Sequence, residues 1–241
     1  MTKGFTLVSA VLLVSMAVAC RQQRYAGLSL DETFPDSAVR QLARAAAAGD
    51  SNRVDRLLRQ GVDINGRGRD NATPLFWSII VYDLNGFRHL LAKGADANIQ
   101  PVTRRGVMHL AAMAKDPEFL EAAIAAGGNV NLVSRHDGTT PISSAIIGRR
   151  IRNIERLIAS GADINFQDPE GVTPAQLAAA INGFDMAYYL LAKGADPMLQ
   201  TKYGHTIMFP IKNNRVALGS DGEKWRLRVI ELLKEKGVRI D

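Results

Sequence analysis

Histidine and cysteine are the side chains that most readily bind metals or act as bases and nucleophiles. The chain has four histidines, His89, His109, His136 and His205, and no two of them have the spacing of a metal-binding pair. Its single cysteine, Cys20, excludes a cysteine-based zinc site and an internal disulfide. The sequence contains no nucleophile-elbow motif and no phosphate-binding loop. It therefore predicts no catalytic residue, no metal site, no cofactor and no small-molecule substrate.

The composition is that of a folded protein. Hydrophobic residues make up 46% of the 241 residues and charged residues 22%, which excludes a disordered or collagen-like chain. The formal net charge of +6 is modest and does not form the concentrated basic footprint of a nucleic-acid-binding protein. We therefore expect no nucleic-acid partner.

Residues 1–19 have the layout of a signal peptide. Lys3 gives a positive start, and the mostly apolar run from Phe5 to Val18 is about 14 residues long. A membrane-spanning helix needs roughly 20 apolar residues, so the run favours cleavage over a transmembrane anchor. A buried N-terminal helix with an incidental cysteine is the alternative.

The segment Ala17-Val18-Ala19-Cys20 resembles the lipobox of bacterial lipoproteins, although Ala17 stands where leucine is usual. This resemblance implies that Cys20 becomes the lipidated first residue of a periplasmic protein. Residues 20–35 would then be the lipid attachment site and a polar tether, and the lipid would be the protein's only contact with the membrane. Arg21 follows the cysteine in place of an aspartate, which in Gram-negative lipoproteins implies the inner leaflet of the outer membrane.

Two short motifs recur in register along the rest of the chain. Glycine-alanine-aspartate or a variant of it begins at Gly61, Gly94, Gly127, Gly161 and Gly194, at spacings of 33, 33, 34 and 33 residues. A threonine-proline motif begins at Thr73, Thr140 and Thr173, with a degraded copy at Thr206 and Gly106 in the same slot. The repeated aspartates are turn residues rather than a catalytic acid and base, because they occur once per repeat.

These motifs resemble the ankyrin repeat, with its Thr-Pro-Leu-His signature, from Pro35 to the C-terminus. The resemblance implies an all-α solenoid of helix-turn-helix units with projecting turns. Proline suits the first position of a helix, and pairs such as Leu157-Ile158 supply the apolar stripe of a second helix. His109 occupies the histidine slot of the signature, which implies a structural role.

We assign residues 36–241 to an ankyrin-repeat domain of six units. The units are 36–67, 68–100, 101–134, 135–167, 168–200 and 201–241. Terminal units are expected to diverge, since one face of each meets water. The last unit carries about ten extra residues around Lys212 to Glu223, which form either a solvated loop or a loop that contacts a partner.

Ankyrin proteins usually bind partners with a concave face made by the turns and the exposed side of each first helix. The repeat phase places an apolar strip there, namely Ile80, Val81, Met113, Ile147 and Ile181. Such a strip marks a protein interface, and Trp77 is a candidate aromatic anchor. The alternative is that these side chains fill gaps between adjacent repeats.

Turn residues add a polar rim to this candidate surface: Arg69, Arg105, His136, Tyr203 and His205. Arg149 and Arg150, with neighbouring Arg152, form a candidate basic patch near the inter-helix turn of the fourth unit. That patch fits an acidic protein or an anionic membrane, and a solvated surface is the third interpretation.

Together, the lipobox and the repeats resemble the ankyrin-repeat immunity lipoproteins found beside type VI secretion effectors, especially lipase effectors. This resemblance implies a non-catalytic, membrane-tethered module that neutralises one secreted phospholipase or lipase. A periplasmic accessory protein that supports an oxidative-stress enzyme or an envelope complex is the alternative.

Overall fold

The computed structural model describes residues 27–240, and this range contains helices and no β-strand. The all-α class expected from the sequence is confirmed. The chain divides into two compact units between Ala95 and Asp96. The expected signal peptide and Cys20 lie outside the described residues. Within the described range, no helix is long and apolar enough to span a bilayer.

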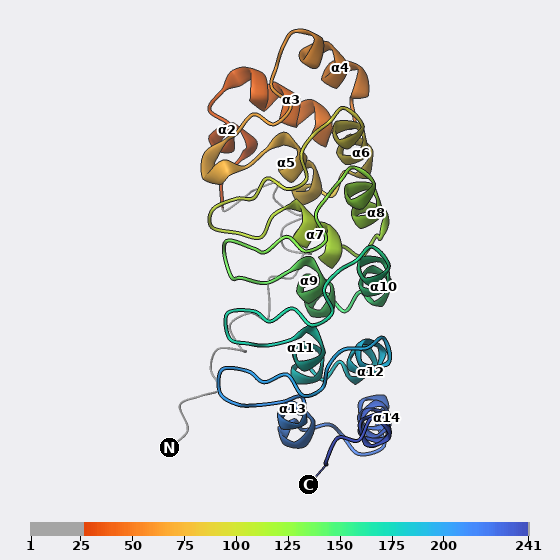
Figure 1. The fold of residues 1–241 in the computed structure, drawn as a ribbon. Coiled ribbons are helices and arrows are strands. Elements are labelled where there is room, and N and C mark those ends of the chain that lie inside the picture. The colour runs from red at the N-terminus through yellow and green to blue at the C-terminus, as the bar shows by residue number, and fades with distance from the viewer. Residues whose placement is uncertain (1–26, 241) are drawn as a thin grey trace. The chain divides into compact units, whose positions relative to one another are not determined.

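Residues 27–95 of the first unit form five α-helices and one short 3₁₀ turn. They are α2 (Leu30–Thr33), α3 (Ser37–Ala47), α4 (Ser51–Arg59), η1 (Arg69–Asn71), α5 (Pro74–Ile80) and α6 (Leu84–Ala92). Helix α3 is central, since it packs against α2, α4, α5 and α6 (Figure 1). The pairs α3–α4 and α5–α6 are the two helix-turn-helix repeats of this unit.

The second unit contains four further helix pairs. They are α7 (Val107–Met113), α8 (Glu118–Ala125), α9 (Pro141–Ile147), α10 (Ile151–Ala159), α11 (Pro174–Ala180), α12 (Phe184–Ala192), α13 (Met208–Asn213) and α14 (Asp221–Glu235). The first helices of successive pairs contact one another in the order α7, α9, α11 and α13. They form one layer, the second helices form another, and the long turns project from the first layer (Figure 1).

The threonine-proline motif starts the first helix of a repeat as expected. The Thr73 hydroxyl accepts a hydrogen bond from the Phe76 backbone nitrogen at 3.1 Å, with Pro74 in the first turn. Thr173 and Gln176 form a capping box in which each side chain accepts from the other's backbone nitrogen. These bonds satisfy amide groups that a helix start leaves unpaired.

Small residues let the helices approach closely. A Cβ atom at Gly86 would lie 1.8 Å from the backbone oxygen of Ala46, so only glycine lets α6 pack here against α3. The glycine that follows α6, Gly94, has a φ of 92°, a left-handed conformation that favours glycine at a helix end.

An asparagine ladder joins the turns of successive repeats in the second unit. The side-chain oxygen of Asn98 accepts from the Asn129 backbone nitrogen at 2.7 Å. The side-chain oxygen of Asn131 likewise accepts from the Asp163 backbone nitrogen at 2.7 Å. That of Asn165 accepts from the Asp196 backbone nitrogen at 2.8 Å. These bonds tie each turn to the next one along the stack.

The predicted tether differs from the structure in its second half. Residues expected to be a polar linker up to residue 35 instead include the helix α2, which is capped by Ser29 and Glu32. The Phe34 side chain is fully buried and lies edge-on to the Trp77 ring, with 6.0 Å between the ring centroids. The fold therefore begins before residue 36, because α2 covers part of the first repeat.

The extra residues of the last repeat are divided between three elements. Lys212 and Asn213 end α13, residues 214–220 form the connection, and residues 221–223 belong to the first turn of α14. The insertion thus lengthens the final helix as well as the loop. Leu218 in the loop is 90% exposed, whereas Val229 and Leu233 on α14 are fully buried.

Candidate protein-binding surface

A row of partly exposed apolar side chains lies at the C-terminal ends of the first helices in the second unit. Met113 ends α7, Ile147 ends α9, and Ile181 follows α11. All three have intermediate burial, so the chain itself covers them only in part. In the first unit, Ile80 and Val81 occupy the same place at the end of α5 and are also partly exposed. We call Met113, Ile147 and Ile181 the apolar row.

Trp77 is not part of an exposed surface. Its side chain is only 1% exposed and packs beside Phe34, which the sequence had assigned to the tether. The prediction of an aromatic anchor at this position was therefore wrong. The buried N-terminal segment, which has no counterpart in the repeat pattern, explains the difference.

Arg149 and Arg150 do not present free guanidinium groups. The Arg149 Nη2 atom donates to the backbone oxygen of Ile181 at 2.6 Å, and the Arg150 Nε atom donates to that of Met113 at 3.0 Å. Each arginine thus joins its repeat to a neighbouring one beside the apolar row. These bonds hold the backbone that carries the row, and the basic patch stays a prediction because Arg149 and Arg152 are exposed.

Arg105 and Asp137 form an ion pair between two successive turns. The Arg105 Nη2 atom lies 2.7 Å from the Asp137 Oδ2 atom. Burial raises the pKa of Asp137, but hydrogen bonds from Thr139 and the charge and hydrogen bond of Arg105 outweigh it and hold the pKa at about 2. Arg105 is therefore engaged within the protein, with only part of its side chain left for a partner.

The other predicted rim residues reach the surface. His136 and Arg69 are exposed, each in a projecting turn of its own unit. Tyr203 is 68% exposed, and its hydroxyl donates to the Glu170 carboxylate at 3.4 Å. The His205 ring stacks on Phe209 with 3.8 Å between centroids. Within the second unit, the exposed turns therefore offer aromatic and ionisable side chains together.

The remaining histidines serve the fold. His109 is fully buried and donates through Nε2 to the backbone oxygen of Thr139 at 3.1 Å. Desolvation lowers its pKa to about 4, so the ring is neutral at physiological pH. His89 donates to the Asp55 carboxylate at 2.8 Å. Nowhere in residues 27–240 do histidine, cysteine and carboxylate side chains gather as a metal site.

Two kinds of residue that position this surface were missed in the sequence. The Asn153 side chain donates to the backbone oxygens of Ala112 and Ala114, which caps the end of α7 beside Met113. The asparagine ladder was missed as well, although Asn65, Asn98, Asn131 and Asn165 all stand four residues after a repeat glycine. That regular spacing was the available signal.

Comparison with known families identifies the repeat. A family model described as ankyrin repeats in three copies matches residues 108–209. This part of the chain therefore matches the ankyrin repeat. The family's fold is generally a non-catalytic scaffold for protein interaction, so the chain carries a protein-binding module.

Solved structures extend the ankyrin fold beyond the matched segment. The ankyrin repeat domain of Bcl-3 is similar with a TM-score of 0.71 and 21% identity, and the match covers 86% of this chain and 88% of that one. An ankyrin repeat domain from Acinetobacter baumannii AYE has a TM-score of 0.71 and 22% identity, with 82% and 98% covered. A third similar chain comes from the structure of the predatory endopeptidase Bd0816 from Bdellovibrio bacteriovorus in complex with immunity protein Bd3460. Its TM-score is 0.63 and its identity 22%, and the match covers 81% of this chain and 97% of that one.

Two curated relatives share more sequence over a shorter stretch. Protein PhlB of Serratia liquefaciens is 32% identical over 141 residues, which are 58% of this chain and 62% of the relative. The human neurogenic locus notch homolog protein 1 is 32% identical over 161 residues, which are 65% of this chain and 6% of the relative. The matched segment thus spans less than two thirds of either relative.

Proposed function

We propose that this protein is a membrane-tethered periplasmic immunity protein. In this proposal it binds one secreted effector, a phospholipase or lipase delivered by type VI secretion, and blocks that enzyme's active site. The lipid on Cys20 holds the binding module where such an effector must act, because the effector's substrate is the membrane itself.

The apolar row is the observation that carries the binding part of the proposal. Met113, Ile147 and Ile181 remain partly exposed at matching ends of three successive helices. Exposed apolar side chains arranged in a row, rather than scattered singly, favour a protein interface. The exposed turns that carry His136 and Tyr203 supply the polar and aromatic contacts that typically surround such a centre.

The surface around the row is rigid, which suits an inhibitor. Arg149, Arg150 and Asn153 all bond to backbone oxygens at helix ends beside the row. A surface held in this way loses little conformational entropy on binding, and that favours tight complexes. An immunity protein needs tight binding because it must block every effector molecule that arrives.

The immunity role rests on two resemblances. The solved neighbour from Bdellovibrio bacteriovorus is a chain in a complex of a predatory endopeptidase with an immunity protein, so the same fold occurs in a complex of that kind. The lipobox-like segment that ends at Cys20 supports attachment to the periplasmic side of a membrane. An enzyme that attacks membrane lipid is the effector class for which attachment at the membrane matters most.

Affinity capture in the native host tests this proposal. The full chain, with Cys20 intact and a C-terminal tag, is expressed at its natural level, and co-purifying proteins are identified by mass spectrometry. We expect one stoichiometric secreted lipase-like enzyme, whose hydrolysis of phospholipid vesicles the purified protein inhibits. Recovery of a resident envelope enzyme or complex, with no effect on any lipase, would instead support the accessory role.

A further inference from the structure

The exposed half of helix α4 is strongly basic. Val54 and Leu57 face the core, and the residues on the opposite side are all exposed: Asn52, Arg53, Arg56, Arg59 and Gln60. The three arginines are spaced by three residues, so they follow one another along the same side of the helix. Two amides accompany them, and Asp55, one turn before Arg59, is the nearest carboxylate within the helix and is only partly exposed. We call Arg53, Arg56 and Arg59 the arginine face.

The nearby carboxylates do not neutralise the arginine face. Asp50 lies at the start of α4, where its side chain accepts from the Arg53 backbone nitrogen at 2.9 Å. Asp55 points toward α6, where Lys93 lies 3.0 Å and His89 2.8 Å away, and hydrogen bonds from these two side chains lower its pKa. Arg53 donates to the Gln41 side chain at 3.3 Å, whereas Arg56 and Arg59 form no ion pair with any described residue.

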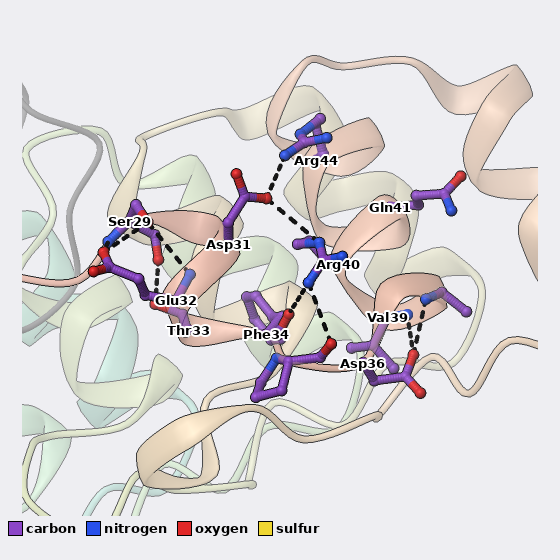
Figure 2. Close-up of polar contacts among 12 residues, drawn as sticks. Ser29, Asp31, Glu32, Thr33, Phe34, Asp36, Val39, Arg40, Gln41 and Arg44 are labelled. Carbon is purple, nitrogen blue, oxygen red and sulfur yellow. Dashed lines mark hydrogen bonds and ion pairs between the residues drawn. The ribbon is translucent and has the colours of Figure 1, made fainter.

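The N-terminal segment enters the fold at the same repeat. The Asp31 carboxylate of α2 accepts from the Arg44 guanidinium of α3 at 2.6 Å and lies 3.4 Å from that of Arg40 (Figure 2). The Arg40 guanidinium also donates to the backbone oxygen of Phe34 at 2.9 Å. These contacts fix α2 on α3, the partner helix of α4. The segment that follows Cys20, the predicted lipid site, therefore joins the fold at the first repeat.

The distance from that lipid site to the fold is short. Six residues, which make seven residue-to-residue steps, separate Cys20 from Gly27, where the described fold begins. At roughly 3.3 to 3.6 Å per residue, they reach at most about 25 Å. Two of them, Arg21 and Arg24, are also basic. A lipid on Cys20 would therefore hold the first repeat close to the membrane surface.

We propose that the arginine face of α4 binds the phosphate groups of an anionic phospholipid membrane. Guanidinium groups form paired hydrogen bonds with phosphate oxygens, and the amides beside them add further donors. The exposed half of α4 bears no large apolar side chain, so the contact is electrostatic and lies at the headgroups. It is a second membrane contact, beyond the lipid anchor, and it does not depend on the identity of the protein partner.

Vesicle flotation tests the proposal without the anchor. The chain from residue 21 to residue 241 contains every described residue but lacks Cys20. We expect it to float with vesicles of phosphatidylcholine and phosphatidylglycerol, to stay behind with phosphatidylcholine alone, and to be released by added salt. Each basic residue near an anionic surface strengthens binding by about fivefold, so Arg56→Ala combined with Arg59→Ala should weaken binding by about 25-fold.

A matched control tests whether vesicle binding depends on the arginine face or only on the net charge of the protein. Lys236 and Arg239 are exposed basic residues at the C-terminal end of the second unit, and replacing both with alanine removes the same charge. We expect this control to bind vesicles within about twofold of the parent. An equal loss of vesicle binding in both double variants would overturn the proposal. Unchanged vesicle binding by the Arg56 and Arg59 variant would overturn it too. If that variant instead loses its protein partner while still binding vesicles, the face belongs to a protein interface and the proposal is wrong. Absence of an effector in the capture experiment would leave the vesicle result unaffected.

Discussion

The middle repeats of the second unit and its C-terminal end are held together differently. In the middle, Asn98, Asn131 and Asn165 each bond to the backbone of the next turn. At the end, Met198 occupies the equivalent position and is 57% exposed. There α14 packs on α12 through apolar contacts, including the Tyr188 and Trp225 rings, whose centroids lie 5.6 Å apart.

This difference shows which part of the molecule has a preorganised surface. A turn tied by side-chain bonds to both neighbours has few alternative conformations, so a partner that binds the middle repeats loses little free energy to ordering. The end repeat lacks the ladder and is stabilised by burial of a longer helix and by Asn214, whose side chain donates to the backbone oxygens of Ala179 and Ala180 at 3.0 Å.

Placing a charge in the middle of the stack should have the largest effect. Leu157 on α10 is fully buried, so Leu157→Asp should lower the free energy of unfolding by about 3 to 5 kcal/mol. Leu218→Asp introduces the same charge where the side chain is 90% exposed. It should change the free energy of unfolding by less than about 0.5 kcal/mol. Urea unfolding followed by circular dichroism measures both. Equal stability of the two variants would contradict the repeat register.

Acid should destabilise the middle repeats through His109. The folded pKa of this histidine is about 4 because of desolvation, against 6.5 for the free side chain, so the unfolded state takes up a proton first. The neutral ring contributes up to about 3 kcal/mol to the free energy of unfolding. This contribution is complete above pH 6.5 and is lost as the pH falls toward 4. His109→Gln should flatten the pH dependence of unfolding in this window. Urea unfolding at several pH values between 4 and 7 measures this, and an unchanged pH dependence in the variant would contradict the expectation.

Removing one rung of the ladder should have an intermediate effect. Asn131 accepts from the Asp163 backbone and donates to the Gly161 backbone oxygen at 3.0 Å. Asn131→Ala should therefore cost about 2 kcal/mol, from two bonds of roughly 1 kcal/mol each. Met198→Ala, at the matching position without a ladder bond, should cost less than about 0.5 kcal/mol. Melting temperatures of the two variants provide the test, and a larger loss at Met198 would reverse the comparison.

An exposed turn residue should affect binding but not stability. Tyr203 is 68% exposed, so Tyr203→Ala should change the free energy of unfolding by less than about 0.5 kcal/mol. If this turn contacts the partner, the same change should weaken the complex by about fivefold, as expected for a tyrosine at an interface. Calorimetric titration with the captured partner checks this expectation. A fall in melting temperature would show that Tyr203 instead supports the fold.

Periodic features could be predicted from the sequence, whereas features specific to one repeat could not. Helix starts such as Thr73 and Thr173 followed from a local motif that satisfies its own backbone groups. The burial of Trp77 did not, because it depends on Phe34, which lies outside the repeat pattern. The roles of Arg149 and Arg150 also required coordinates, since their partners are backbone oxygens more than 30 residues away.

The apolar row is the central feature of the proposed binding surface, and one comparison tests it most directly. Ile147→Asp places a charge in the middle of the row, and Leu218→Asp places the same charge outside it. Both full-length variants are used for affinity capture in the host, with circular dichroism to confirm that each is folded. We predict that the Leu218 variant recovers the same single protein as the parent and that the folded Ile147 variant recovers none. Equal recovery by both variants would contradict binding through the row.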